Sequence, residues 1–253
     1  MSLQWQGTVR INRPAAEDTY LLSFDCAGLA RQARPGQFLH VRRSSTSEPL
    51  LRRPFSIHDT DRGAVSVLYR VVGKGTSLMS SLRPGDSIDV LGPLGRGFRI
   101  PQRSGKELVV AGGMGIAPML FLIRRLGRPA PKVLYGCRSR SQVVAVPGNK
   151  AICTDDGTCG RKGLVTDSLS SMLRRHGPCR VYACGPWAML KEVARLCQEF
   201  HAPCQVSLES FMACGVGACQ GCVVSGTSGY LTVCSDGPVF DSRKIDWEQR
   251  SPV

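Results

Sequence analysis

The sequence has no long apolar run. Its best candidate for a membrane span, residues 108–123, is interrupted by three glycines and a proline, whereas a spanning helix needs roughly 20 mostly apolar residues. The first residues also lack the apolar stretch of a secretory signal peptide. We therefore expect a protein without a membrane span and with a cytoplasmic location.

Lysine and aromatic residues are also scarce, although the net charge is +14. Only seven of the 33 basic residues are lysine, and aromatic residues make up 6% of the chain. Single-stranded nucleic acids are usually bound by aromatic side chains in basic grooves, so we expect no nucleic-acid partner. We interpret the charge as a solvated basic surface, which also suits anionic small molecules or an acidic protein partner.

The pattern of strand, helix and glycine–cysteine signals changes twice along the chain. These changes divide it into three predicted segments: 1–101, 102–203 and 204–253. The first segment contains short β-rich runs separated by turn signals, which indicates an antiparallel barrel or sandwich. These runs are 3–10, 19–25, 37–42, 64–72 and 87–91.

Strand and helix patterns alternate in the second segment, which indicates a parallel α/β sheet. We expect strands at 107–111, 132–135, 151–154 and 180–183, and helices at 116–126, 167–175 and 186–200. The third segment is rich in glycine and cysteine and has few apolar periods, so something other than an apolar core must organise it.

Four of the twelve cysteines have the spacing of an iron–sulfur site. Cys214, Cys219, Cys222 and Cys234 follow the pattern C-x4-C-x2-C-x11-C, and the first three match the spacing of plant-type 2Fe–2S ligands. Interleaved glycines allow the backbone to wrap closely around an inorganic core. Zinc ribbons usually present two C-x2–4-C knuckles of similar size, so a zinc site is the less favoured alternative.

An arginine, an aromatic residue and a serine in one predicted strand suit a flavin. In the run Arg53, Pro54, Phe55 and Ser56, the first and third side chains share one face of the strand. The arginine can pair with a pyrophosphate, the phenylalanine can lie along the flavin ring, and the serine can hydrogen-bond near its N5 atom. By itself the motif is short enough to arise by chance.

A second segment, residues 68–76, supports the flavin interpretation. It ends in a glycine-rich turn before an apolar run, and turns that open a helix leave N–H groups free for phosphate. Tyr69 could form a wall for the flavin, although a tyrosine in a strand is more often part of a core.

Two predicted strand–turn–helix connections indicate a nucleotide site. One reads Ala-Gly-Gly-Met-Gly-Ile-Ala-Pro over 111–118, and the other reads Ala-Cys-Gly-Pro over 183–186. Neither is a dinucleotide fingerprint, so the interpretation rests on their context. Ligands of parallel sheets bind at the carboxyl ends of strands. We expect Gly113 and Gly115 beside the nucleotide and Cys184 as the candidate catalytic residue, with a buried thiol as the alternative.

Together these segments resemble the ferredoxin reductase superfamily, and more closely the electron-transfer subunits of NAD-dependent dihydroorotate dehydrogenases. The resemblance covers nearly the whole chain. It rests on the runs LLRRPFSI, LYRVVGKGT, GPLGRGF, AGGMGIAP, CGVGACQGCVV and CSDGPVF.

The resemblance implies an FAD-binding β-barrel, an NAD-binding α/β domain and a small C-terminal lobe that holds the 2Fe–2S cluster on the four spaced cysteines. The FAD contacts that it implies are Arg53, Pro54, Phe55, Ser56, Leu68, Tyr69, Arg70, Gly75 and Thr76.

The resemblance also implies a partner. Nicotinamide accepts two electrons as a hydride and a 2Fe–2S cluster passes one, so FAD belongs between them. Electrons would pass from the FMN of a dihydroorotate dehydrogenase catalytic subunit through the cluster and FAD to NAD, in pyrimidine biosynthesis, within a heterotetramer of two of each subunit. The alternatives are a subunit of another redox complex, such as a hydrogenase or a ferredoxin–NAD(P) oxidoreductase, and a zinc-stabilised nucleic-acid-binding module.

Overall fold

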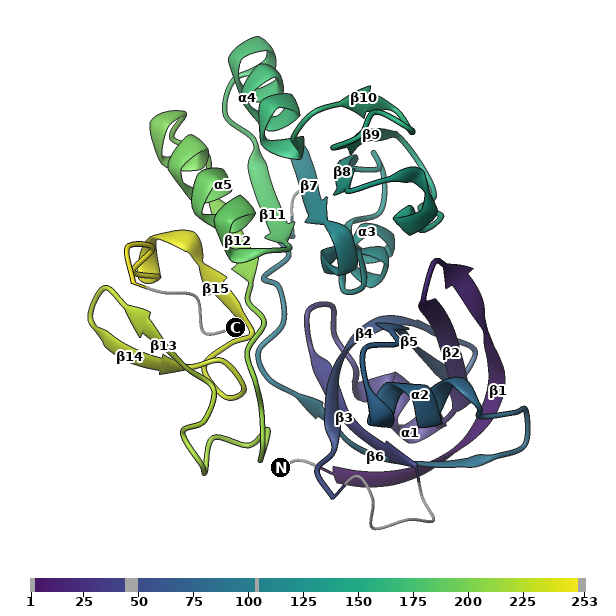
Figure 1. Cartoon of the computed structure of the whole chain (residues 1–253). Coiled ribbons are helices and arrows are strands. Elements are labelled where there is room, and N and C mark those ends of the chain that lie inside the picture. Colours follow the sequence, from purple (N-terminus) through teal and green to yellow (C-terminus); the bar gives the residue numbers. More distant parts are fainter. Residues whose placement is uncertain (1–2, 44–49, 103–104, 250–253) are drawn as a thin grey trace.

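The first part of the chain folds into a closed antiparallel barrel (Figure 1). In this computed structural model, which describes residues 3–43, 50–102 and 105–249, its strand order is β1-β2-β5-β4-β3-β6. Side chains alternate: Val65, Val67 and Tyr69 of β5 are buried in the barrel core, whereas Leu68 packs outside it. The strands are β1 (Leu3–Ala16), β2 (Thr19–Asp25), β3 (Phe38–Arg43), β4 (Arg53–Asp61), β5 (Ala64–Arg70) and β6 (Ser87–Leu94).

Two short helices accompany the barrel. The sequence pattern does not predict α1 (Ala27–Gln32), a helix in which Leu29 is buried. The second helix, α2 (Lys74–Ser80), begins before the apolar run that starts at residue 77. Its early start has a local cause, because the Thr76 hydroxyl accepts the N–H groups of Val72 and Gly73 and closes the turn.

The middle of the chain forms the predicted parallel α/β sheet. Among the described residues its order is β10-β9-β8-β7-β11-β12-β15, and each neighbouring pair is parallel except β12 and β15. The strands are β7 (Glu107–Gly112), β8 (Lys132–Cys137), β9 (Lys150–Thr154), β10 (Arg161–Lys162), β11 (Arg180–Cys184), β12 (Cys204–Ser207) and β15 (Val239–Asp241).

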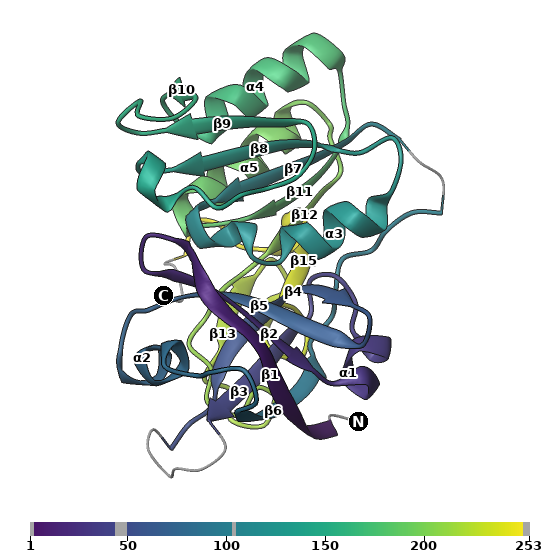
Figure 2. The same cartoon turned by 90° about the vertical axis from the view of Figure 1, so that its right-hand side faces the viewer.

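Helices lie on both faces of this sheet (Figure 2). α4 (Val165–His176) and α5 (Trp187–Glu199) cover the face away from the barrel, and α3 (Met119–Leu126) lies between the sheet and the barrel. The helix expected over 116–126 is interrupted: η1 (Gly113–Ile116) is a short 3-10 turn, and α3 starts only after Pro118. Proline has no backbone N–H to continue a helix, so a new helix begins beyond it.

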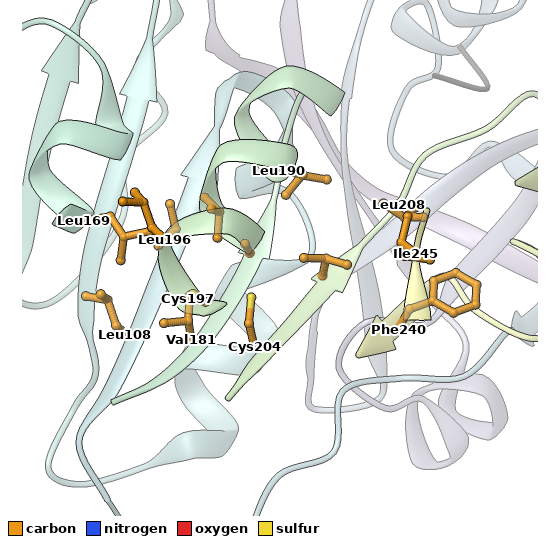
Figure 3. Packing of buried hydrophobic residues seen from close by; sticks show 14 of the residues in the cluster. Leu108, Leu169, Val181, Leu190, Leu196, Cys197, Cys204, Leu208, Phe240 and Ile245 are labelled. Carbon is orange, nitrogen blue, oxygen red and sulfur yellow. The ribbon is translucent and has the colours of Figure 1, made fainter. Parts of the chain in front are cut away.

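The outer helices pack on the sheet through aliphatic side chains (Figure 3). Leu169 of α4 and Leu196 of α5 share one buried cluster with Val181 of β11. The cluster continues into Phe240 and Ile245 of the C-terminal lobe. The lobe is therefore anchored on the sheet by apolar packing.

The C-terminal lobe starts later than the sequence pattern indicates. The predicted boundary lies before Cys204, but Cys204–Ser207 form β12, which pairs in parallel with β11. A strand of four residues is too short to show a periodic pattern, which explains the difference. The lobe itself contains β13 (Val223–Gly226), β14 (Gly229–Thr232) and η3 (Ser242–Lys244), and it lends β15 to the edge of the sheet.

The lobe also contacts the barrel. The Arg96 N–H donates to the Gly237 carbonyl at 2.5 Å. Gly95 has a φ of +75°, and a Cβ there would lie 2.8 Å from the same carbonyl oxygen. The barrel, the sheet and the lobe thus meet one another. None of the helices in the described part of the chain has the length and apolarity that a membrane crossing requires.

Candidate functional site

The barrel opens between β4 and β5 at the segments predicted to bind a flavin. β4 pairs with β5 only over residues 57–61, opposite 64–67. Residues 53–56 keep their partners on β3, and residues 68–70 keep theirs on β2. Each segment therefore has one strand edge without a ladder partner in the described structure, where backbone N–H and C=O groups can bond a ligand. This opening fits a flavin.

Two aromatic rings from these segments touch. The half-buried Phe55 meets Tyr69 edge to face, with ring centroids 5.7 Å apart. Tyr69 is only 1% exposed, and its hydroxyl donates to Asn12 Oδ1 at 3.2 Å. Burial, opposed by the Asn12 contact, raises the pKa of Tyr69 to about 12. The Tyr69 side chain is thus part of the core, which leaves its backbone to face the opening.

Arg53 and the glycine-rich turn lie together, as the flavin hypothesis requires. Arg53, Gly75 and Arg43 line one small cavity of about 20 Å³ between β3, β4 and α2. The half-buried Arg53 guanidinium donates to the Leu51 carbonyl. The Thr76 hydroxyl is occupied by the turn itself, so any contact from that residue to a ligand would involve its backbone.

A cavity of about 590 Å³ separates the sheet from the barrel. Arg70 and Val72, from the end of β5 and just beyond it, lie on one side of it. The other side is formed by residues at or just beyond the carboxyl ends of five parallel strands, β7, β8, β9, β11 and β12; examples are Gly112, Gly136, Asp155, Gly185 and Glu209. Sheet connections leave β7 and β11 in opposite directions, and this switch point is where open α/β sheets bind ligands.

The two predicted nucleotide turns pack against each other at this edge. Gly113 has a φ of +51°, and a Cβ there would meet nothing within 4 Å, so its backbone is open to the cavity. Gly115 differs, because a Cβ there would lie 2.1 Å from the Cys184 carbonyl oxygen. Gly115 lines the cavity, but its lack of a side chain is required by the neighbouring turn.

Cys184 lies at the predicted position but is 1% exposed. Burial and the negative charge of Glu209 raise the pKa of its thiol. The residues that line the cavity at this turn are Gly185 and Pro186. The role of Cys184 in the nicotinamide pocket stays a prediction.

Several charged residues of the cavity were missed by the sequence analysis. Asp155 follows β9, Glu192 lies on α5 and Glu209 follows β12. Recognition of β12 as a parallel strand would have identified Glu209, because the residue after such a strand lies at the ligand-binding edge. Asp155 is exposed and Glu192 is half-buried, and neither belongs to a local motif.

The four spaced cysteines lie in one loop and in the turn after β14. Backbone N–H groups of this loop point at sulfur: Val216 and Cys219 donate to Cys214 Sγ at 3.4 Å, and Gly217 donates to Cys234 Sγ at 3.2 Å. Burial opposes ionisation of Cys214, but these N–H groups outweigh it and lower the pKa of its thiol. At Cys214 the loop therefore favours thiolate, the form that binds metal, whereas burial and the neighbouring Cys222 raise the pKa of Cys234.

The thiols are arranged as two pairs. Cys214 contacts the side chain of Cys219, and Cys234 contacts that of Cys222. In the part of the chain that the structure describes, no three His, Cys, Asp or Glu side chains lie close enough to hold a single metal ion. A 2Fe–2S cluster has two irons with two protein ligands each, and two thiol pairs fit that donor set.

Two family models match the parts of the chain that contain these candidate sites. Residues 8–98 match the family described as "Oxidoreductase FAD-binding domain", and residues 209–246 match "Iron-sulfur cluster binding domain of dihydroorotate dehydrogenase B". The chain therefore carries an FAD-binding barrel and an iron–sulfur domain.

Curated relatives match the chain over most of its length. "Dihydroorotate dehydrogenase B (NAD(+)), electron transfer subunit" of Desulforamulus reducens is 41% identical over 92% of this chain and 94% of the relative. The protein of the same name from Bacillus caldolyticus is 39% identical over 94% and 96%.

Solved structures share the fold. A chain from the NADH-dependent reduced ferredoxin–NADP oxidoreductase, studied for flavin-based electron bifurcation, superposes with a TM-score of 0.85 at 30% identity, over 96% of this chain and 90% of that one. The ferredoxin reductase of carbazole 1,9a-dioxygenase superposes with a TM-score of 0.68 at 20% identity, over 80% and 67%, and is similar in fold alone. With its barrel, nucleotide cavity and paired cysteines, the chain belongs to the family of dihydroorotate dehydrogenase B (NAD(+)) electron transfer subunits.

Proposed function

We propose that this chain conducts electrons from the FMN of a dihydroorotate dehydrogenase catalytic subunit, through 2Fe–2S and FAD, to NAD⁺ in pyrimidine biosynthesis. The observation that carries the proposal is the contiguity of the three sites. The cavity joins the open edge of β5 to the carboxyl edge of the sheet, and the cysteine loop touches the barrel at β3. We further infer a cytoplasmic heterotetramer of two catalytic and two electron-transfer subunits.

The chemistry explains why one chain holds three sites. FAD exchanges two electrons with nicotinamide as a hydride and single electrons with an iron–sulfur cluster. This chain's residues bind and orient the groups: we assign FAD to the barrel of residues 1–101, NAD to the sheet from residue 102, and the cluster to the lobe after β12.

The FAD contacts can be divided between side chains and backbone. We propose that Arg53 pairs with the pyrophosphate and that Phe55 and Ser56 approach the flavin ring. Leu68 and Tyr69 are buried, so they would contribute backbone groups at the open edge of β5. The remaining proposed contacts are Pro54, Arg70, Gly75 and Thr76.

In the nucleotide cavity, Gly113 offers an open backbone and Gly115 keeps the two turns in contact. We propose that the nicotinamide lies against Gly185 and Pro186, which line the cavity. Cys184 stays a candidate for this pocket because it precedes them, although its thiol is buried.

The first test is reconstitution with a catalytic partner. Alone, the chain should reduce an artificial acceptor with NADH and should not oxidise dihydroorotate. Mixed with an FMN-containing dihydroorotate dehydrogenase subunit, it should support dihydroorotate-dependent reduction of NAD⁺. Dihydroorotate would lose two electrons and two protons to become orotate; NAD⁺ would take up both electrons and one proton to become NADH, and the second proton would be released. A mixture that forms a complex but produces no NADH would reject the proposal.

A second candidate function is an electron-transfer subunit of a ferredoxin–NAD(P) oxidoreductase, favoured by the 0.85 TM-score to such a chain. The partner distinguishes the two. Affinity purification of the tagged chain from its own cells should retain an FMN-containing protein that oxidises dihydroorotate, whereas a partner that reduces ferredoxin would support the second candidate.

The proposed ligands have a separate test. Cys219 is exposed, so Cys219→Ser should leave the apolar core intact. We expect this variant to lose most iron and acid-labile sulfide while it retains FAD. Cys159→Ser, which changes a partly exposed cysteine outside the loop, is the matched control and should keep both. Full iron retention in Cys219→Ser would remove that residue from the ligand set.

A further inference from the structure

The buried His40 lies where the barrel meets the cysteine loop. Its neighbours Leu39 and Val41 on β3 belong to the barrel core, so His40 faces outwards by strand alternation. It is nevertheless only 1% exposed. The loop covers it: a Cβ on Gly215 would lie 2.8 Å from His40 Cε1 and 2.9 Å from its Nε2. The face of the imidazole ring thus packs on the backbone next to the proposed ligand Cys214.

The Nε2 atom of His40 is unsatisfied. It is buried and has no hydrogen-bond partner among residues 3–43, 50–102 and 105–249. A buried polar atom without a partner destabilises the fold, so such atoms in native proteins usually meet a ligand, an ion or water. The position of this one against the loop points to the group that the loop holds.

Sulfur of the bound cluster is the acceptor that fits Nε2. The N–H groups of Val216, Gly217 and Cys219 are already directed at cysteine sulfurs. If Nε2 were an acceptor, no N–H group of the loop would be free to donate to it. A protonated Nε2 would instead be a further N–H donor to sulfur. Burial and the nearby charge of Arg52 lower the pKa of His40 to about 4, so the ring is a neutral donor near neutral pH.

We propose that His40 donates a hydrogen bond from Nε2 to a sulfur of the 2Fe–2S cluster and so raises its reduction potential. This inference rests on the proposed ligand set. A donor to sulfur stabilises the reduced form, which carries one more negative charge, and hydrogen bonds to sulfur are among the determinants of these potentials. The proton stays on His40 while the electron enters and leaves.

The position of His40 gives this hydrogen bond a functional place. On β3 it pairs in register with Pro54 of β4, inside the proposed flavin run. The β3–β4 ladder is therefore a hydrogen-bonded connection between His40, which packs on the cysteine loop, and the flavin opening. His40 is a positioning and tuning residue on this connection.

The test is a redox titration of the holoprotein, followed by electron paramagnetic resonance of the reduced cluster. We expect His40→Leu to keep iron and FAD but to shift the cluster midpoint to a more negative value. His40→Gln, whose amide N–H reaches about as far as Nε2, should move it back towards the wild-type value. The FAD midpoint in the same samples serves as an internal reference, and His176→Leu, at an exposed histidine of α4, is the matched control.

A second readout detects the proposed hydrogen bond in the wild-type protein itself. In wild-type protein labelled with ¹⁵N only in histidine, pulsed resonance should detect a weak nitrogen coupling to the reduced cluster. His40→Leu should abolish it and His176→Leu should preserve it. Two results would overturn the inference: an unchanged cluster midpoint in His40→Leu, or a shifted midpoint in that variant when the wild-type protein shows no nitrogen coupling. A wild-type chain without a 2Fe–2S signal would instead refute the ligand assignment.

Discussion

Arg53 is the residue on which the proposed pyrophosphate contact depends most directly. It lines the same small cavity as Gly75 of the glycine-rich turn, and a hydrogen bond to a charged group contributes about 1.5–3 kcal/mol. We expect Arg53→Ala to raise the FAD dissociation constant by roughly 10- to 100-fold. Fluorescence titration of the apoprotein with FAD measures this. Arg31→Ala, at an exposed position of α1, should bind FAD like the wild type.

Gly115 offers a second test, one of packing. A Cβ there would lie 2.1 Å from the Cys184 carbonyl oxygen, and backbone atoms cannot move aside as a flexible side chain can. We expect Gly115→Ala to destabilise the fold by at least about 1–3 kcal/mol, as overpacking does, and to weaken NADH binding because the two turns separate.

The control for this substitution is Gly105→Ala, since the nearest atom to a Cβ there is Arg180 Nη1 at 4.0 Å. Thermal unfolding of both variants provides the comparison. Equal melting temperatures for Gly115→Ala and the wild type would show that the turn tolerates the side chain.

At the scale of single residues, the sequence identified chemistry better than accessibility. The spacing of Cys214, Cys219 and Cys222 indicates one loop, because ligand spacing is a local property; Cys234 lies in the turn after β14, and the shared ligand role of the four stays a prediction. The amino-acid sequence could not show that Tyr69 and Cys184 are buried, since burial depends on elements far away in the chain. For the same reason His40 showed no local signal, as its contact is with Gly215.

At the scale of elements, the contact between β4 and the turn before α3 makes stability depend on pH. His58 Nδ1 donates to the Ala117 carbonyl at 2.6 Å. Burial, opposed by that carbonyl and by Asp59, lowers the pKa of His58 below 6.5. Below about pH 6.5 the unfolded chain therefore binds a proton at His58 more readily than the folded chain does. The contribution of neutral His58 to the free energy of unfolding is fully present above about pH 6.5 and is lost as the pH falls below it.

We therefore expect the melting temperature to fall between pH 6.5 and pH 5. His58 should lower the free energy of unfolding by at most about 1.4 kcal/mol per pH unit over this range. His58→Gln should flatten this decline in part, because His40 also has a lowered pKa. The exposed His176 is the reference, and His176→Gln should leave the decline unchanged. A profile in His58→Gln that is as steep as in the wild type would contradict the assignment.

Elements with a clear period were predictable and those fixed by tertiary contacts were not. β7, β8 and β11 are buried runs, and α4 and α5 have one apolar face, so their patterns are visible in the sequence. β12 and β15 are too short for that. The opening between β4 and β5 depends on where a ladder ends, which no local pattern records.

At the scale of the whole molecule, the barrel acts as the centre of the arrangement. β5 faces the nucleotide cavity with Arg70, and β3 faces the cysteine loop with His40. The two faces belong to one rigid hydrogen-bonded barrel, so the spacing of the proposed cofactor sites is set by strand geometry. The +14 charge of the chain suits both an anionic nucleotide and an acidic partner surface.

This arrangement predicts that the two half-reactions can be separated. The cysteine loop presents Phe211 and Val216, which are 73% and 49% exposed, and we expect the catalytic partner to cover this side of the lobe.

Cys219→Ser should keep NADH oxidation with an artificial acceptor near the wild-type rate, because the FAD and nucleotide sites lie on the barrel and the sheet. With the partner present, it should lose dihydroorotate-dependent NAD⁺ reduction by at least tenfold, since the cluster is the proposed connection between the two flavins. Stopped-flow measurement of both reactions on one preparation, with complex formation checked by gel filtration, distinguishes loss of conduction from loss of binding. An intact complex of the cluster-free variant that couples the two reactions at the full rate would mean that electrons take another route.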